Sequence, residues 1–236
     1  MSDIHLGGSS PETEKVKRAR LEALVQRVAE EKGALFILGD LFDFWFEYKT
    51  VIPKTAFGFL ASLDATAAEG TPVYYIGGNH DFWLCDFLDK ETHIQVLADG
   101  TELNAQGKKT YLAHGDGLGP GDTGYKILKK VFRNPLAIWL FRWVHPDLGI
   151  KLALSTSHVS REHTSDHVVD VERLFRDVAK PELLKGRDAM IVGHHHVRHH
   201  AKNAEGEFLI LGDWFRQFTY ARLQGGSYES LAWTDD

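Results

Sequence analysis

The spacing of apolar and polar residues along this chain predicts an alternation of helices and strands. From residue 10 to residue 33 the apolar positions recur every three or four residues, the period of an amphipathic helix: Leu21, Leu24, Val25 and Val28. Ser10 can cap this helix and Pro11 suits its first turn. Residues 53–70 predict a second helix. The chain therefore begins with two helices whose apolar sides need a sheet to pack against.

Three short segments are continuously apolar, and each predicts a strand that is covered on both faces. They are "ALFIL" (34–38), "VYYIGG" (73–78) and "DAMIVG" (188–193). Because helices alternate with them, we expect an α/β sheet. Residues 93–115 and 199–233 instead predict short strands joined by turns, the latter as two hairpins. We expect a single domain over 1–236, with a helical cap inserted at 117–165.

Composition narrows the class of protein. The chain has 236 residues, 43% hydrophobic and 25% charged, which is typical of a soluble globular protein. Its net charge of -6 does not favour a nucleic-acid surface. Cys85 is the only cysteine, so no internal disulfide is possible. We find neither a signal peptide nor an apolar run of about 18 residues, and we expect a cytoplasmic location.

Polar residues gather where the predicted strands end. Asp-x-His, Gly-Asp-x-x-Asp, Gly-Asn-His-Asp, His-Gly-Asp and Gly-His-x-His occur in this order. Ligands of open α/β sheets bind beyond the carboxyl ends of strands, so these groups should meet at one edge. A single Gly-Asp or Asn-His is usually a turn or a cap, and only the conjunction predicts a site. The candidate ligands are Asp3, His5, Asp40, Asn79, His114, His194 and His196.

These candidate ligands offer oxygen and nitrogen donors and no thiolate, a set that suits Mn²⁺, Fe²⁺ or Zn²⁺. Seven ligands are too many for one tetrahedral ion but suit two ions that share a carboxylate. Two ions about 4 Å apart can hold both oxygens of a displacement at phosphorus. The residues therefore predict a two-metal phosphoester hydrolase.

With these motifs the chain resembles the calcineurin-like metallophosphoesterase superfamily over nearly its whole length. The resemblance implies a four-layer sandwich of two mixed β-sheets flanked by helices. It also implies two divalent ions, expected to be Mn²⁺. One would be held by Asp3, His5, Asp40 and His196, and the other by Asp40, Asn79, His114 and His194. His80 would then act on the phosphate or the leaving group, oriented by the Asp43 carboxylate; the alternative is a structural histidine. We assign no role to His195, His199 or His200.

Several longer segments resemble one branch of that superfamily, the UDP-2,3-diacylglucosamine diphosphatases of lipid A synthesis. They are "SDIHLG", "GDLFDFWFEY", "GNHDFWL", "AHGDGLGPGDTGYK", "FRNP", "LFRWVHPDLG", "GHHH" and "LGDWFRQFTYA". The resemblance implies cleavage of the substrate to UMP and diacylglucosamine 1-phosphate. It implies substrate contacts from Asn79, His80, Asp122, Tyr125, Ser160 and His194. Many members carry Arg at the position of His80, and Thr164 and His167 replace the amide and basic residues of the family.

The segment from 117 to 165 leaves two interpretations open. Lys126, Lys129, Lys130 and Arg133 make its first part basic, and "LAIWLFRWV" is apolar on nearly all faces. It is either a basic surface helix followed by a core helix, or a cap that accepts acyl chains and touches anionic lipid. The resemblance favours the cap, with an acylated UDP-sugar as substrate and a peripheral position on the inner face of the inner membrane. We then expect Trp139, Phe141 and Trp143 partly to line an apolar cleft.

Two other functions stay open at this point. The chain could be a general phosphodiesterase or nucleotide pyrophosphatase without lipid preference, or a scaffold that lost its metals. The N-terminus bears on the last possibility, because only Met1 and Ser2 precede Asp3 where the resemblance implies an apolar strand. We expect Asp3 to lie loosely beside a free terminus, and the first metal to bind weakly.

Overall fold

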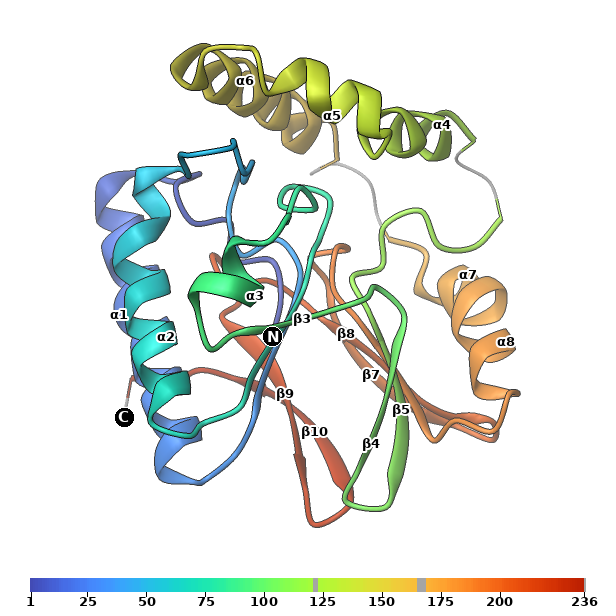
Figure 1. Ribbon diagram of the computed structural model, residues 1–236. Coiled ribbons are helices and arrows are strands. Elements are labelled where there is room, and N and C mark those ends of the chain that lie inside the picture. The colour runs from blue at the N-terminus through green and yellow to red at the C-terminus, as the bar shows by residue number, and fades with distance from the viewer. Residues whose placement is uncertain (121–122, 165–168, 236) are drawn as a thin grey trace.

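The computed structural model describes residues 1–120, 123–164 and 169–235 (Figure 1). Its helical elements are α1 (Pro11–Glu30), η1 (Lys54–Ala56), α2 (Phe57–Ala68), α3 (Phe87–Glu91), α4 (Thr123–Phe132), α5 (Pro135–Phe141), α6 (Pro146–Thr164), α7 (Val171–Leu174), the π-helical η2 (Phe175–Ala179) and α8 (Lys180–Leu183). The helix predicted from residue 10 is confirmed, with the Ser10 side chain accepting a hydrogen bond from the Thr13 N–H. None of the described helices is long and apolar enough to cross a membrane.

The strands form a mixed sheet and two smaller sheets. The mixed sheet has the order β4-β5-β6-β8-β7, from Thr101–Ala105, Lys108–Ala113, Ala189–Val192, Gly206–Leu211 and Arg198–Asn203. A parallel sheet β1-β2-β3 contains Leu35–Leu38, Val73–Ile76 and Gln95–Leu97. An antiparallel pair contains β9 (Thr219–Gln224) and β10 (Ser227–Ala232). The two predicted hairpins, β7–β8 and β9–β10, are confirmed.

Helices and sheets stack as the predicted four layers, with α1 and α2 on one side and α7 and α8 on the other (Figure 1). Three buried apolar clusters correspond to the three interfaces between these layers. One packs Leu21 of α1 against Ile37 of β1, and the second packs Leu38 of β1 near Ile191 of the mixed sheet. The third joins the other face of the mixed sheet, including Phe208, to Leu183 of α8. The α/β fold class is therefore confirmed.

The helices α4, α5 and α6 run across one end of the molecule (Figure 1). Phe141 at the end of α5 stacks on Trp83 with the ring centroids 5.7 Å apart, and packs on Phe46 at 4.7 Å. Trp139 and Trp143 are 53% and 76% exposed, so the interpretation of this segment as a core helix is wrong. The reason is that α5 contacts the body of the protein through Phe141 in its last turn, whereas Leu136, Trp139 and Leu140 are exposed.

The first residues of the chain are held firmly, which corrects the expectation of a loose Asp3. Asp3 is buried, its N–H donates to the Gly39 carbonyl, and its own carbonyl accepts from the Trp214 N–H. The Met1 carbonyl accepts from the Leu38 N–H, and the Met1 amine donates to the Phe36 carbonyl at 2.9 Å. Met1 thus pairs with β1 in the parallel sense, because it bonds to the residues on either side of Ile37.

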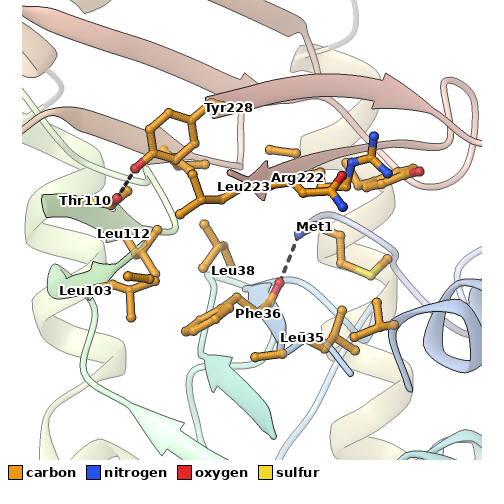
Figure 2. Close-up of a pocket in the computed structure, with 18 of the residues that line it drawn as sticks. Met1, Leu35, Phe36, Leu38, Leu103, Thr110, Leu112, Arg222, Leu223 and Tyr228 are labelled. Carbon is orange, nitrogen blue, oxygen red and sulfur yellow. Dashed lines mark hydrogen bonds between the residues drawn. The ribbon is translucent and has the colours of Figure 1, made fainter. Parts of the chain in front are cut away.

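A gap separates β1 from β9, so the described strands form three sheets where two mixed sheets were predicted. Its volume is about 400 Å³, and its walls include residues of α1, β1, the mixed sheet and β9. Figure 2 shows Met1 at this gap, between Phe36 on β1 and Arg222 and Leu223 on β9. Tyr228 closes one side through a hydrogen bond between its hydroxyl and that of Thr110. The edges of β1 and β9 therefore face each other across a largely apolar space.

Candidate metal centre

The predicted ligands come from segments directly after strands β1, β2, β5 and β6, and from the N-terminal segment beside β1. Parallel strands β1 and β2 bring Asp40 and Asn79 to one edge of their sheet, and parallel strands β5 and β6 bring His114 and His194 to the same end of the mixed sheet. A Cβ on Gly78 would overlap the Asp40 carboxylate, so glycine is required where these turns meet. The convergence expected from strand-end position is thus present in the structure.

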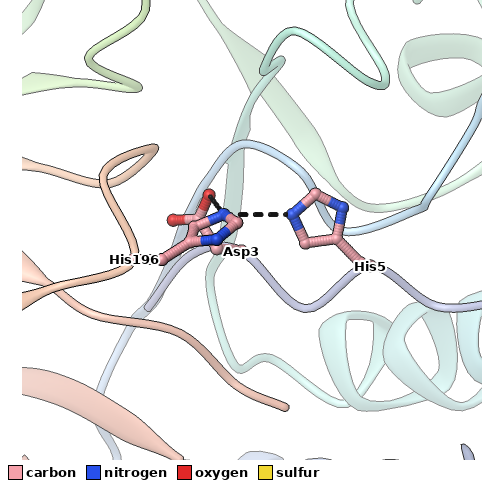
Figure 3. Close-up of side chains that lie close together, drawn as sticks. All are labelled: Asp3, His5 and His196. Atoms are coloured by element: carbon pink, nitrogen blue, oxygen red, sulfur yellow. Dashed lines mark hydrogen bonds and ion pairs between the residues drawn. The ribbon is translucent and has the colours of Figure 1, made fainter. Parts of the chain in front are cut away.

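Asp3, His5 and His196 form the first ligand group (Figure 3). The Nε2 atoms of His5 and His196 lie 3.4 Å apart, and His196 Nε2 lies 3.3 Å from Asp3 Oδ1. Asp3 Oδ2 accepts from the backbone N–H of His194 at 2.8 Å. Asp3 and His5 are buried, and His196 has 31% of its side chain exposed. One face of the group therefore stays open to solvent.

Asp40, His114 and His194 form the second group. His114 Nε2 lies 3.4 Å from Asp40 Oδ2 and 3.0 Å from Asn79 Oδ1. The His114 Nδ1 atom lies 2.8 Å from the Leu38 carbonyl, a contact that fixes the ring and directs Nε2 into the site. The rings of His114 and His194 are 5.2 Å apart. Asn79 therefore lies beside this group, and its role as a metal ligand stays a prediction.

The Asp40 carboxylate lies between the two groups. Its Oδ2 atom is 3.7 Å from His5 Nε2 in the first group and 3.4 Å from His114 Nε2 in the second. Its Oδ1 atom accepts from the His80 N–H at 2.9 Å. Asp40 is thus placed where a carboxylate could serve both ions, which is the position expected of a bridging ligand.

The pKa values around this carboxylate reflect burial and the opposed charges. Burial alone would raise the pKa of Asp40, but His114, His80 and His5 hold it well below its usual range. Burial opposes the charged form of His114 as well, yet Asp40 raises its pKa well above the usual value. For His194, burial and the nearby His114 lower the pKa to about 3. A metal ion at the second group would therefore have to displace a proton from His114.

Backbone conformation marks the same residues. Asp3, His5, Asp40, His194 and His196 have φ values of 56°, 49°, 54°, 66° and 52°. Non-glycine residues rarely adopt this left-handed region, although Asp and His do so more often than most. Such conformations cost about 1–3 kcal/mol each and persist where surrounding contacts impose them, often at functional sites. Five candidate ligands therefore share a left-handed backbone conformation, which no pattern in the sequence predicted.

Buried polar residues outside the predicted ligand set hold these turns in place, and sequence reasoning missed their roles. Asp81 accepts hydrogen bonds from the N–H groups of Asp40, Leu41, Phe42 and Gly78 and from the Tyr75 hydroxyl. It thereby ties the turn after β1 to the turn after β2. Lys17 is buried on α1 and donates to the His5 carbonyl at 2.7 Å. The only hint was that Asp81 belongs to the Gly-Asn-His-Asp segment.

His80 lies next to the first group, with its ring centroid 4.6 Å from that of His5. Its Nδ1 atom is 2.8 Å from the backbone carbonyl of Asp43. The Asp43 carboxylate lies 3.4 Å from His5 Nδ1. Asp43 is therefore close to both histidines: its backbone carbonyl contacts the His80 ring, and its carboxylate offers an oxygen within 4.8 Å of ring nitrogens of His5 and His80. The catalytic roles of His80 and Asp43 stay predictions.

The residues predicted to touch substrate are only partly described. Tyr125 on α4 lies with its ring 6.5 Å from that of His194, and its hydroxyl donates to the buried Asp116 at 2.8 Å. Lys129 on the same helix forms an ion pair with Asp116 at 2.6 Å. Asp122 lies outside the described residues, and the side chain of Ser160 does as well. Substrate contact from these residues stays a prediction.

The three histidines without a predicted role lie near the second ligand group or on β7. The His195 ring is 5.2 Å from that of His194, and burial lowers the pKa of His195 to about 4. On β7, His200 pairs with Glu207 at 2.8 Å and His199 packs against Phe208. His199 and His200 therefore have structural partners away from the site.

The donor set fits divalent cations. Asp3 Oδ1 is a buried oxygen that accepts no hydrogen bond of good geometry, although His196 Nε2 lies 3.3 Å from it. A buried acceptor of this kind costs free energy unless a donor or a cation meets it. The two groups together offer carboxylate, imidazole and amide ligands, which suit Mn²⁺, Fe²⁺ or Zn²⁺. The geometry is therefore compatible with the predicted pair of ions.

The fold and this arrangement of ligands agree with the class of protein found by comparison. Residues 1–200 match the calcineurin-like phosphoesterase family, and the chain belongs to that family. Membership implies a hydrolase that uses divalent metal ions, as the sequence predicted.

Within this family, the chain is similar to relatives that share one name. The chain is 34% identical to a UDP-2,3-diacylglucosamine hydrolase of Porphyromonas gingivalis, over 95% of this chain and 92% of that protein. It is 31% identical to the enzyme of the same name from Pseudomonas paraeruginosa, over 92% and 90% of the two chains. Among solved structures, an archaeal phosphodiesterase aligns over 98% of this chain and 96% of its own, at 11% identity and a TM-score of 0.44. The family assignment is based on the sequence matches.

Proposed function

We propose that this chain hydrolyses the pyrophosphate bond of UDP-2,3-diacylglucosamine to UMP and 2,3-diacylglucosamine 1-phosphate, in lipid A biosynthesis. The observation that carries the proposal is the position of Asp40, whose Oδ2 atom lies within 4 Å of imidazoles from both ligand groups. The relatives that carry this activity in their names match more than nine-tenths of the chain, which supports this substrate.

In this proposal Asp3, His5, Asp40 and His196 hold one ion, and Asp40, Asn79, His114 and His194 hold the other. When bound there, two divalent ions, expected to be Mn²⁺, would supply Lewis acidity toward phosphate oxygens and water. His80 donates a hydrogen bond to the phosphate or a proton to the leaving group, with its Nδ1 atom held by the Asp43 carbonyl.

Helices α4, α5 and α6 form the cap that accepts the acyl chains, which we place at 117–165. Ten large apolar side chains of this segment are at least 42% exposed: Ile127, Leu128, Val131, Phe132, Leu136, Trp139, Leu140, Trp143, Leu148 and Leu152. So much exposed apolar surface on a few neighbouring helices is typical of a site that binds lipid or a partner. The Lys129–Asp116 ion pair and the Tyr125–Asp116 hydrogen bond anchor α4 beside the metal-binding groups.

The same surface supports a peripheral position on the inner face of the inner membrane. Lys130 and Arg133 add positive charge next to the exposed apolar residues of α4, and anionic lipid attracts such charge. Lys129 contributes less than the sequence implied, because its ammonium group is bound to Asp116. Membrane contact and substrate loading would then use one surface.

The test is to incubate the purified chain with UDP-2,3-diacylglucosamine and Mn²⁺ and to identify the products by mass spectrometry. We expect UMP and the diacylated sugar phosphate, with Asp40→Asn as the inactive control. The same UDP-sugar without acyl chains should turn over much more slowly. Equal turnover of the two substrates would instead favour a general pyrophosphatase, and a protein that binds no metal would favour a scaffold.

A further inference from the structure

The loop from Gly212 to Phe218 connects β8 to β9 and touches the first ligand group at several points. The Trp214 N–H donates to the Asp3 carbonyl at 3.0 Å. The Phe215 ring packs edge-on against the His5 ring at 5.8 Å and the His196 ring at 5.3 Å. Neither the ligand prediction nor the family match, which ends at residue 200, includes this loop.

The loop owes its shape to Asp213, which is buried at its start. Asp213 Oδ1 accepts from the N–H groups of Phe215, Arg216 and Gln217 at 3.1, 2.6 and 3.0 Å. Its Oδ2 atom accepts from the Gln217 side-chain amide at 2.7 Å. One carboxylate thus folds the loop and also aims the Gln217 side chain.

The Gln217 amide bridges the turn that carries His196. Its Nε2 atom donates to the His196 carbonyl at 2.7 Å, and its Oε1 atom accepts from the Arg198 N–H at 3.3 Å. The side-chain amide thus makes the two hydrogen bonds that one backbone residue of a parallel neighbouring strand would make, to the carbonyl before Val197 and to the N–H after it. His196 adopts a φ of 52°, so its backbone needs an external restraint to stay in this conformation.

We propose that Gln217 is a positioning residue that, aimed by Asp213, holds His196 in its left-handed conformation and thereby sets the affinity of the first metal site. The inference rests on the proposed two-metal function. The second group has separate supports, since the Leu38 carbonyl holds the His114 ring and Asp81 holds the turn at Asp40. Loss of the Gln217 amide should therefore affect one metal equivalent and spare the other.

Gln217→Glu tests this proposal, because the direction of the change in metal affinity distinguishes an effect of geometry from an effect of charge. Glutamate has nearly the same shape but places oxygen against the His196 carbonyl and the Asp213 carboxylate. By charge alone the substitution would strengthen cation binding nearby, whereas lost positioning would weaken it. Gln95→Glu, at an exposed glutamine of β3, is the matched control for the added charge. Gln217→Met removes the hydrogen bonds without adding charge and serves if the glutamate variant does not fold.

The measurement is calorimetric titration of the metal-free proteins with Mn²⁺, with Co²⁺ absorption as a second readout. We expect two equivalents on the unmodified chain and on Gln95→Glu. On Gln217→Glu and Gln217→Met, one equivalent should bind about 10–100-fold more weakly, the range for residues that support a metal ligand. Two unchanged equivalents on the Gln217 variants would overturn the positioning role alone. A chain that binds no Mn²⁺ before any substitution would overturn the proposed function as well.

Discussion

Because Met1 lies at the gap between β1 and β9, residues added before Met1 should change the free energy of unfolding of this chain. Met1 is buried there, and burial lowers the pKa of its amine from 8.0 to about 5 even though the nearby Asp3 carboxylate favours the charged form. The perturbation is an N-terminal extension of five residues in an apolar, β-branched pattern. The matched control is a Gly/Ser extension of equal length, which removes the α-amine from the gap without offering a strand.

The amine contributes a pH dependence whose sign is fixed by linkage. Its folded pKa is depressed, so the unfolded chain binds the proton more tightly between about pH 5 and pH 8. The associated stability is present above pH 8 and is lost as the pH falls toward 5. A change from 8.0 to about 5 corresponds to a loss of about 1 kcal/mol at pH 7 and about 3 kcal/mol at pH 6. Both extensions should remove this dependence.

The apolar extension should add stability beyond the Gly/Ser control. A strand between the facing edges of β1 and β9 would form about four further backbone hydrogen bonds, at roughly 1 kcal/mol each. It would bury two or three apolar side chains in the 400 Å³ gap, at about 2 kcal/mol each. Ordering five residues opposes this by about 1–2 kcal/mol per residue. At the middle of these ranges, a gain of about 9 kcal/mol exceeds a cost of about 7–8 kcal/mol, which leaves about 1–2 kcal/mol in favour of the strand.

The assay is urea unfolding of the three metal-free proteins at pH 6, 7 and 8.5. The reasoning on the amine is refuted if the unextended chain loses no stability relative to the Gly/Ser form as the pH falls. Equal stability of the two extended proteins would refute the reasoning on the gap. Because Asp3 and His5 are already buried and bonded, neither extension should be needed to order them. Equal Mn²⁺ affinity in all three would agree with this.

The site and the cap support three other predictions. His80→Ala should keep both Mn²⁺ equivalents and lose about 10²–10⁴-fold in kcat, the usual range for general acid–base help; an unchanged kcat would make His80 structural. Asp81→Asn should lower the free energy of unfolding by about 2–4 kcal/mol, because either orientation of the amide turns a donor toward backbone N–H groups; Asp86→Asn, at an exposed carboxylate, is the control, and equal urea midpoints would contradict the expectation. Binding to anionic liposomes should fall with salt and with Lys130→Glu plus Arg133→Glu, at about 1 kcal/mol per charge; binding that ignores salt would argue against an electrostatic membrane contact.

The sequence by itself determined the elements and the chemistry of the site. Apolar spacing located α1, and its cap at Ser10 was readable from residue type. Continuous apolar segments located β1, β2 and β6. Candidate ligands could be found because they come directly after such strands, and parallel strands bring the residues at their carboxyl ends to one edge. These features depend on residues close together along the chain, so a local pattern suffices to find them.

The tertiary structure decided how each group is held. The left-handed backbone of Asp3, His5 and His196 is imposed by contacts from α1, β1 and the loop after β8, which lie far away in sequence. Exposure of Trp139 and pairing of Lys129 likewise depend on which face of the cap meets the body. The gap beside Met1 is lined by residues of α1, β1 and β9, of which β9 is far from the other two in sequence and meets them only in the folded chain. Such properties come from partners brought together only by folding, so no spacing along the chain encodes them.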